Sequence, residues 1–170
     1  MTESLIPPVS RELPRRTLVK GAAWSVPVIA ATVAAPLAAA TVAQDAGAYQ
    51  LNGTCGVLGT LGPGFTLTAS ATSAIPAGTV ITITGSGVAN IGVFTVTGGT
   101  ATVSILSATS RTITTTAEIA AGATMAIRTT LSITAAFTLS ATATLPSGWS
   151  ATGAKSTASV TSTLVLCSAA

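Results

Sequence analysis

The amino-acid sequence predicts an all-β fold, an antiparallel sandwich of about seven or eight short strands. From Phe65 onward, apolar and polar residues alternate with a period of two, which is typical of strands with one buried face. Turn signals built from glycine and proline recur about every ten residues in the same part of the chain. No segment there carries, at useful length, the apolar stripe that a helix needs.

The clearest alternation runs through residues 137–145, where Phe, Leu and Ala alternate with Thr and Ser. Threonine, valine and isoleucine favour strands because β-branched side chains pack well on a pleated surface and lose rotamer freedom in helices. In chain order, the predicted strands cover residues 65–68, 81–84, 94–97, 103–105, 112–116, 125–133, 137–145 and 159–167.

Two of the strand-to-turn passages are similar to each other. Residues 65–68 and 137–140 read Phe-Thr-Leu-Thr and Phe-Thr-Leu-Ser, and the turns at 75–78 and 145–148 each place an apolar residue and proline before glycine. We interpret the similarity as a consequence of turn geometry, because similar turns require similar residues, and we prefer this interpretation to a ligand-binding repeat. The strand-plus-turn pattern resembles the immunoglobulin-like modules common in bacterial surface proteins, and this resemblance implies an immunoglobulin-like sandwich.

Near the N-terminus, the charged residues form a motif. Pro14 precedes the pair Arg15 and Arg16, which is followed by one spacer, the apolar Leu18 and Val19, and Lys20. This arrangement resembles the twin-arginine motif of bacterial signal peptides, although proline replaces the usual serine before the pair. The resemblance implies export by the twin-arginine translocase, with signal peptidase as the second partner during export.

The twin-arginine motif is followed by an uncharged run at residues 21–40, which ends in Ala38-Ala39-Ala40. Small residues at Ala38 and Ala40 meet the requirement for signal-peptidase cleavage after Ala40, and cleavage after Ala43 is the alternative. The whole leader resembles those of small secreted proteins from high-GC Gram-positive bacteria, which implies a secreted, extracellular protein. An uncleaved leader that anchors the protein in the membrane is the alternative.

These features divide the chain into three parts. Residues 1–40 are predicted to be a helical twin-arginine signal peptide, residues 41–64 an N-terminal extension with the first strand region, and residues 65–170 the β-sandwich domain. The two cysteines, Cys55 and Cys167, lie near the two ends of the exported part. An even count in an exported protein predicts a disulfide, and the absence of histidine argues against a zinc site.

The charge and composition exclude several function classes. The first 40 residues carry four basic and two acidic side chains (net +2), and the rest carry three basic and two acidic ones (net +1). A net charge near +1 cannot neutralise a run of phosphates, so no nucleic-acid partner is expected. The chain has no histidine, and after position 40 its acidic residues are Asp45 and Glu118 alone. Side chains that could act as general acid or base are therefore almost absent, so we predict neither enzymatic activity nor a cofactor.

The remaining functional expectation is an exported structural or interaction module of the cell envelope or secretome, whose near-neutral surface would allow self-association. A secreted module that binds a carbohydrate or another small ligand is the alternative, with Trp149 as a possible stacking residue. The preferred interpretation of Trp149 itself is that it plugs one end of the sandwich.

The few charged residues of the exported part are assigned from the sequence alone. Asp45 is expected in a flexible tail, and Arg111, Arg128 and Glu118 on solvated strand faces. The side chains of Asn52, Asn90, Glu118 and Lys155 are interpreted as ordinary surface groups, with a Lys–Asn isopeptide crosslink as the alternative.

Overall fold

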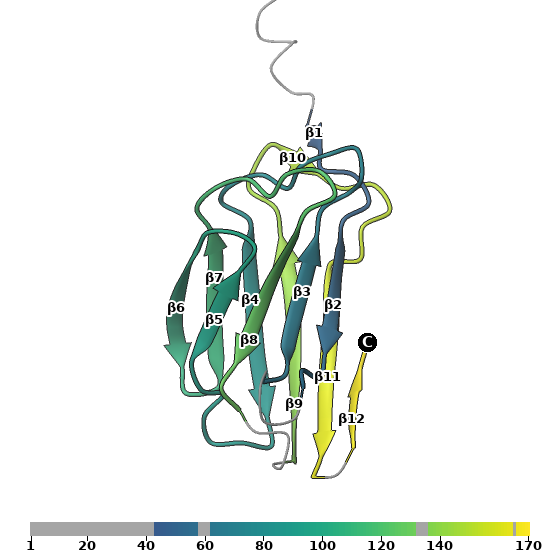
Figure 1. Cartoon of the computed structure of the whole chain (residues 1–170). Coiled ribbons are helices and arrows are strands. Elements are labelled where there is room, and N and C mark those ends of the chain that lie inside the picture. Colours follow the sequence, from purple (N-terminus) through teal and green to yellow (C-terminus); the bar gives the residue numbers. More distant parts are fainter. Residues whose placement is uncertain (1–42, 58–61, 132–135, 165) are drawn as a thin grey trace, which may run out of the picture. The chain divides into compact units, whose positions relative to one another are not determined.

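The computed structural model describes residues 43–57, 62–131, 136–164 and 166–170. The predicted helical signal peptide, with its arginine motif and its cleavage site after Ala40, lies outside these residues. The described residues form one compact unit from Ala43 to Ala170, and they contain strands but no helix (Figure 1). The predicted all-β class is therefore confirmed.

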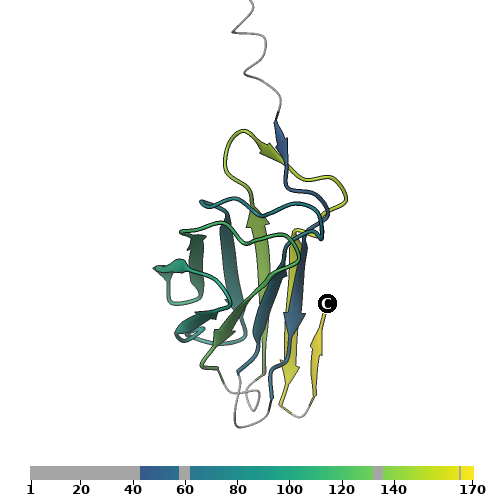
Figure 2. The ribbon, with the colours of Figure 1, turned by 45° about the horizontal axis from the view of Figure 1, so that its top comes forward.

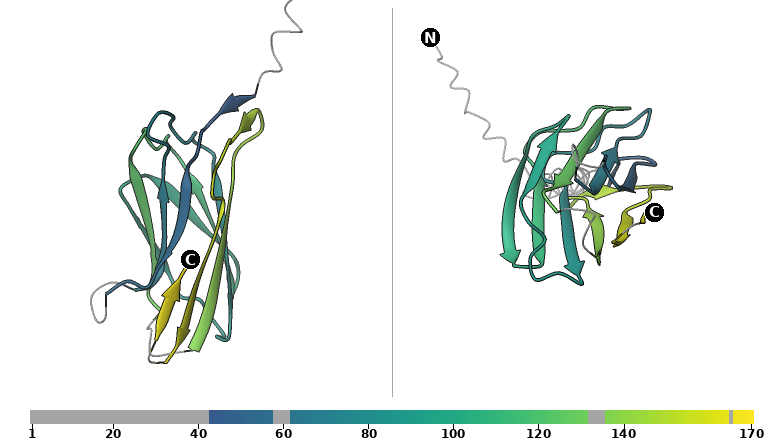
Figure 3. Two further views of the ribbon diagram at one scale, coloured as in Figure 1. Left: turned by 90° about the vertical axis from the view of Figure 1, so that its right-hand side faces the viewer. Right: turned by 60° about the horizontal axis from the view of Figure 1, so that its bottom comes forward.

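Two antiparallel sheets face each other (Figure 3). The larger sheet has six strands in the order β12-β11-β9-β4-β7-β6. Its strands are β4 (Val80–Ser86), β6 (Ala101–Ser107), β7 (Ser110–Thr115), β9 (Ala136–Thr144), β11 (Thr157–Thr163) and β12 (Cys167–Ala169).

The smaller sheet has four strands in the order β2-β3-β8-β5, all antiparallel to their neighbours. These strands are β2 (Gln50–Thr54), β3 (Gly64–Thr68), β5 (Phe94–Thr97) and β8 (Thr124–Thr129). Two short strands, β1 (Gln44–Asp45) and β10 (Trp149–Ser150), pair in parallel at one end of the sandwich (Figure 2).

The core lies between the two sheets and follows from the period-two pattern. Along β9, buried Phe137, Leu139, Ala141 and Ala143 alternate with Thr and Ser side chains that lie on the outer face. The facing sheet contributes alternate residues of β3 and β8 in the same way. The largest fully buried side chains are Phe65, Leu51, Leu67, Ile75, Ile81, Ile83, Ile91, Ile113, Met125, Ile127, Leu139 and Val160.

The strands differ from the prediction in number and in several boundaries, of which two differ most. The region 159–167, expected as one strand, is divided between β11 and β12, which form a hairpin. The strand expected over 125–133 ends at Thr129. The range 41–64 contains β1 and also β2, which is a full member of the smaller sheet and buries Leu51 completely.

Backbone contacts join the two sheets along one side. The amide of Leu51 on β2 donates to the carbonyl of Lys155 at 2.8 Å, and the amide of Gly53 donates to the Ala170 oxygen at 3.1 Å. A Cβ atom on Gly53 would lie 2.3 Å from the carbonyl oxygen of Ser159 on β11, so only glycine permits this approach. The β2 edge is therefore covered by the other sheet.

Tyr49 precedes β2 and is 3% exposed. Burial raises the pKa of its hydroxyl above the ordinary value of 10.0. Because the pKa of Tyr49 is higher in the folded chain than in the unfolded chain, the unfolded chain loses this proton first as the pH rises. The free energy of unfolding therefore decreases as the pH rises above 10.0.

We expect the urea denaturation midpoint of the wild type to fall in this alkaline range, and to fall less in the variant Tyr49→Phe. Urea titrations of both proteins between neutral pH and pH 11 would test this; identical curves would contradict it.

Candidate functional site

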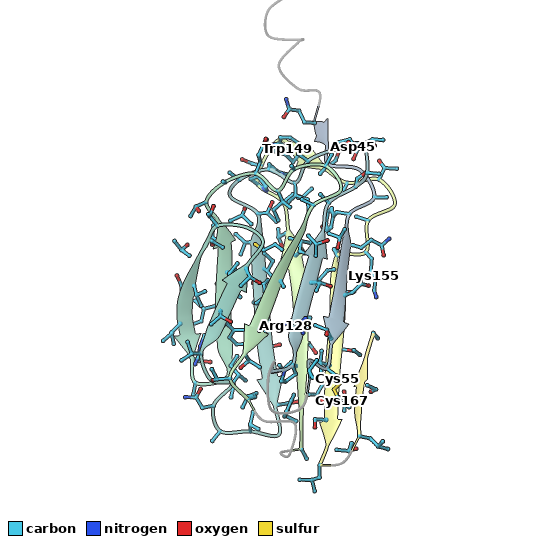
Figure 4. All side chains as sticks on the ribbon, in the orientation of Figure 1. Asp45, Cys55, Arg128, Trp149, Lys155 and Cys167 are labelled. Atoms are coloured by element: carbon cyan, nitrogen blue, oxygen red, sulfur yellow. A yellow bond between two sulfur atoms is a disulfide. The ribbon has the colours of Figure 1, made fainter. Side chains whose placement is uncertain are left out.

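The predicted disulfide between Cys55 and Cys167 is present, with an S–S distance of 2.08 Å and a Cα–Cα distance of 5.8 Å (Figure 4). Cys55 directly follows β2, and Cys167 begins β12, so the bond joins the edge strands of the two sheets. It closes a sequence separation of 112 residues. The bond therefore reinforces the side of the sandwich that the Leu51 and Gly53 contacts already close.

Trp149 begins β10 at the end of the sandwich, near the Asp45 of β1 (Figure 4). Its side chain is half-buried and packs against the core. Asp45 accepts hydrogen bonds from the side chain of Thr152 and from the amides of Gly47 at 2.8 Å and Thr152 at 3.0 Å, and these bonds lower the pKa of its carboxyl from the ordinary value of 3.8. Asp45 is therefore part of an ordered end of the sandwich, and its predicted place in a flexible tail is wrong.

Lys155 is exposed and donates from Nζ to Oδ1 of Asn52 at 3.0 Å. An open depression of about 420 Å³ lies beside it on the outer face of β9 and β11. Small polar side chains and alanines line this depression, and Trp149 does not take part. Among the contacts of the described residues, neither Asn52 nor Lys155 forms a hydrogen bond with a carboxylate. The ammonium group of Lys155 is therefore bound at the surface by an uncharged amide oxygen.

Arg111 on β7 differs most from its predicted place, because its side chain is 4% exposed and not on a solvated face. Its guanidinium donates to the carbonyls of Ser107 and Ser110, which flank the β6–β7 turn. It also donates to Oδ1 of Asn90 and to the carbonyl of Gly92, both at 3.1 Å. The acceptors are all uncharged. Arg111 therefore fastens the β4–β5 loop to the β6–β7 hairpin, a role that sequence reasoning missed.

The two other charged residues that were assigned to solvated faces have ordinary surroundings. Arg128 on β8 is half-buried and donates from Nη1 to Oγ1 of Thr54 at 2.9 Å. This bond crosses β3 at Gly64, which is the register partner of both residues and has no side chain to block it. Glu118 is exposed, as predicted, but it lies in the β7–β8 connection, so its predicted place on a strand face is wrong.

The four edge strands of the two main sheets differ in how well they are protected from pairing with another strand. The edge at β2 is covered through Lys155 and Ala170, the edge at β12 is only three residues long, and β5 has four residues. Natural sandwiches commonly blunt their edges by such short or covered strands. The fourth edge, β6, has seven residues with no charge and no proline, and it lies at the left border of the domain in Figure 1.

Strand β6 is exposed along almost its whole length. Register places Ala101, Val103 and Ile105 opposite Thr115, Ile113 and Arg111 of β7, so their side chains share the core-facing side of the sheet. Val103 is nevertheless 39% exposed and Ile105 is 74% exposed. Ala101 packs against the core, and the β4–β5 loop covers Arg111, but among the described residues neither this loop nor the four-stranded sheet fully covers Val103 and Ile105.

The backbone groups of β6 that point away from β7 belong to the residues whose side chains lie on the inner face, namely Ala101, Val103 and Ile105. The amide of Thr116 donates to the carbonyl of Thr100, which makes these two a hydrogen-bonded pair of the β6–β7 ladder. Hydrogen-bonded and non-hydrogen-bonded pairs alternate in an antiparallel ladder. Thr102 and Ser104 therefore bond to β7, while the amides and carbonyls of Ala101, Val103 and Ile105 point to the free edge. A bulge at Leu106 ends this regular run.

Within residues 43–57, 62–131, 136–164 and 166–170, no group of three or more His, Cys, Asp or Glu side chains is placed to hold a metal ion. The described part also contains no helix that is long and apolar enough to cross a membrane. The export residues Arg15, Arg16, Leu18 and Lys20, and the cleavage residues Ala38 and Ala40, lie outside the described residues.

Comparisons with families of related proteins, with curated proteins and with solved structures gave no match. The candidate site therefore rests on the geometry of the chain itself, and this geometry favours the free edge of β6 over the other surfaces.

Proposed function

We propose that this chain is an exported, non-enzymatic β-sandwich that acts as a structural or interaction module of the cell envelope or secretome. The observation that carries the proposal is the β6 edge, where unpaired backbone groups and uncovered apolar side chains lie together. Such an edge is a ready template for pairing with a strand of another protein. The module would bind its partner through main-chain hydrogen bonds, with Val103 and Ile105 covered in the contact.

The sandwich is proposed to be immunoglobulin-like, and its strand order supports this. Constant-type immunoglobulin domains have sheets with the orders ABED and CFG. Strands β2-β3-β8-β5 match ABED, and β4-β9-β11 match CFG, with the same chain order and antiparallel pairing. The hairpin β6–β7 is then an insertion between D and E that pairs with the outer side of C. The free edge therefore belongs to an addition to the common sandwich.

Export by the twin-arginine route is supported by the leader, with its Arg15-Arg16 pair and small residues before position 41. The Cys55–Cys167 disulfide is consistent with an oxidising, extracellular location. Because twin-arginine cargo is folded before it crosses, the translocase and signal peptidase are the expected partners during export, and the disulfide is expected to form after folding.

The proposal is tested by exporting three proteins from the same bacterial host: the wild type, Val103→Lys and Val57→Lys. Val57 is an exposed valine outside β6 and serves as the matched control. Culture medium and envelope washings are separated by size without prior purification. We expect wild type and Val57→Lys in assemblies larger than a monomer, and Val103→Lys as a monomer. Wild type that is monomeric in both fractions, or that stays inside the cell, would contradict the proposal.

A further inference from the structure

The partner of the β6 edge can be specified further, on the premise of the proposed interaction function. We propose that this partner is a second copy of the same chain, and that two β6 strands pair antiparallel about a two-fold axis at Val103. The two six-stranded sheets would then continue into one sheet across the pair. The argument rests on the register of the backbone groups, on the side chains beside them and on charge.

The backbone of β6 is self-complementary in one register. The outward groups belong to Ala101, Val103 and Ile105, and a two-fold axis at Val103 places each of them opposite another member of this set. Ala101 faces Ile105 of the second copy, Val103 faces its own equivalent, and Ile105 faces Ala101. Each pair would exchange two N–H···O bonds, about six in all. A shift of the axis toward Ser107 would bring the bulge at Leu106 into the ladder and lose bonds.

The side chains of the same residues fit this pairing. Ala101, Val103 and Ile105 lie on the inner face of the sheet, where Val103 and Ile105 are uncovered in the single chain. In the pair, the inner faces of the two copies become continuous, so each copy's β6 covers part of the apolar strip that the short facing sheet leaves open. Cross-strand pairs of β-branched residues stabilise such contacts.

Charge does not oppose the association of two copies. Strand β6 has no charged residue, and β5 has none. The guanidinium of Arg111, which lies opposite Ile105, is buried and bound to carbonyl groups. From position 41 onward the chain has a net charge of only +1, so the mutual repulsion of two copies is small. A second copy also offers an uncharged strand of the same length, as this edge requires.

The test uses purified protein, either in the form that the host releases or as the full chain where the leader is retained. Its molar mass is measured by size-exclusion chromatography and light scattering. We expect the wild type to have twice the monomer mass at high concentration and to dissociate on dilution. Val103→Lys places two lysines opposite each other on the axis, and we expect the dissociation constant to rise about tenfold or more. Val57→Lys should dimerise like the wild type.

Charge complementation tests the register. Val103→Glu alone should be monomeric, like Val103→Lys, but an equimolar mixture of the two variants should regain the dimer, because lysine then faces glutamate. Thermal melts establish that each variant is folded. A monomeric wild type, a dimeric Val103→Lys, or a folded mixture that remains monomeric would overturn the inference.

The outcomes also separate this inference from the proposed function. Purified protein that is monomeric, although the same protein occurs in larger assemblies in cell fractions, would overturn the second copy as partner and leave the interaction function standing. A purified dimer with the Val103 register, together with monomeric protein in cell fractions, would support the pairing and contradict the function.

Discussion

Replacing both Cys55 and Cys167 by serine is expected to lower the free energy of unfolding by about 2–4 kcal/mol while leaving the sandwich folded. The bond closes a separation of 112 residues. In the chain-entropy model, a loop of about 100 residues gives about 4.7 kcal/mol, and measured gains are commonly smaller. The Leu51 and Gly53 hydrogen bonds, which join the same two sheets, remain in the variant.

Urea denaturation of the wild type and the double variant measures this effect, and a thermal melt should show a decrease of about 10 °C in the melting temperature. The internal control is a reducing agent, which should destabilise the wild type to the level of the variant and leave the variant unchanged. A variant that is unfolded in water would contradict the expectation that a twin-arginine cargo folds before its disulfide forms. A variant as stable as the wild type would contradict the stabilising role of the bond.

Replacing Arg111 by methionine is expected to cost about 3 kcal/mol of stability, in the range seen when a buried hydrogen-bond network is broken. Methionine keeps much of the apolar stem but removes the guanidinium that donates to the carbonyls of Ser110 and Gly92. Oδ1 of Asn90 loses its bond to Arg111 and keeps only the one from the amide of Gly92. Lysine at this position should also be destabilising, since a single ammonium group cannot reach acceptors on both the loop and the turn.

The matched control is Arg128→Met, which removes a half-buried arginine with one bond to Thr54 and should cost about 1 kcal/mol or less. Denaturant midpoints of the two variants give the comparison. An equal decrease in the free energy of unfolding for both variants would show that the buried hydrogen bonds of Arg111 stabilise the fold no more than the single bond of Arg128. A loss for Arg111→Met that leaves exchange of the β6 and β7 amides unchanged would show that Arg111 does not fasten this hairpin.

The period-two pattern predicted the fold class well because burial between two sheets repeats every second residue. The strand at 137–145 illustrates this, since its apolar members are buried in β9. The disulfide was predictable from the count and position of the cysteines. Strand β2 is harder to see in the sequence, because Asn52 and Gly53 interrupt the apolar pattern, and Gly53 is required by the close approach of β11.

The candidate site was less predictable, and β6 shows why. Its alternation at Val103 and Ile105 predicted a strand, but the same pattern predicts burial, and these side chains are exposed because the facing sheet ends at β5. Alternation reports which side chains share a face and not whether a second layer covers that face. The place of Arg111 was missed for a related reason, since its acceptors come from a loop about 20 residues earlier in the chain and from its own turn.

The most direct test of the free β6 edge and its pairing is amide hydrogen exchange along β6, followed by NMR at low and high protein concentration. The amides of Thr102 and Ser104, which face β7, should be protected at both concentrations. Those of Ala101, Val103 and Ile105 should exchange freely in the dilute protein and gain protection in the concentrated one. Equal exchange of these three amides at both concentrations, or protection of all five in the dilute monomer, would contradict the account.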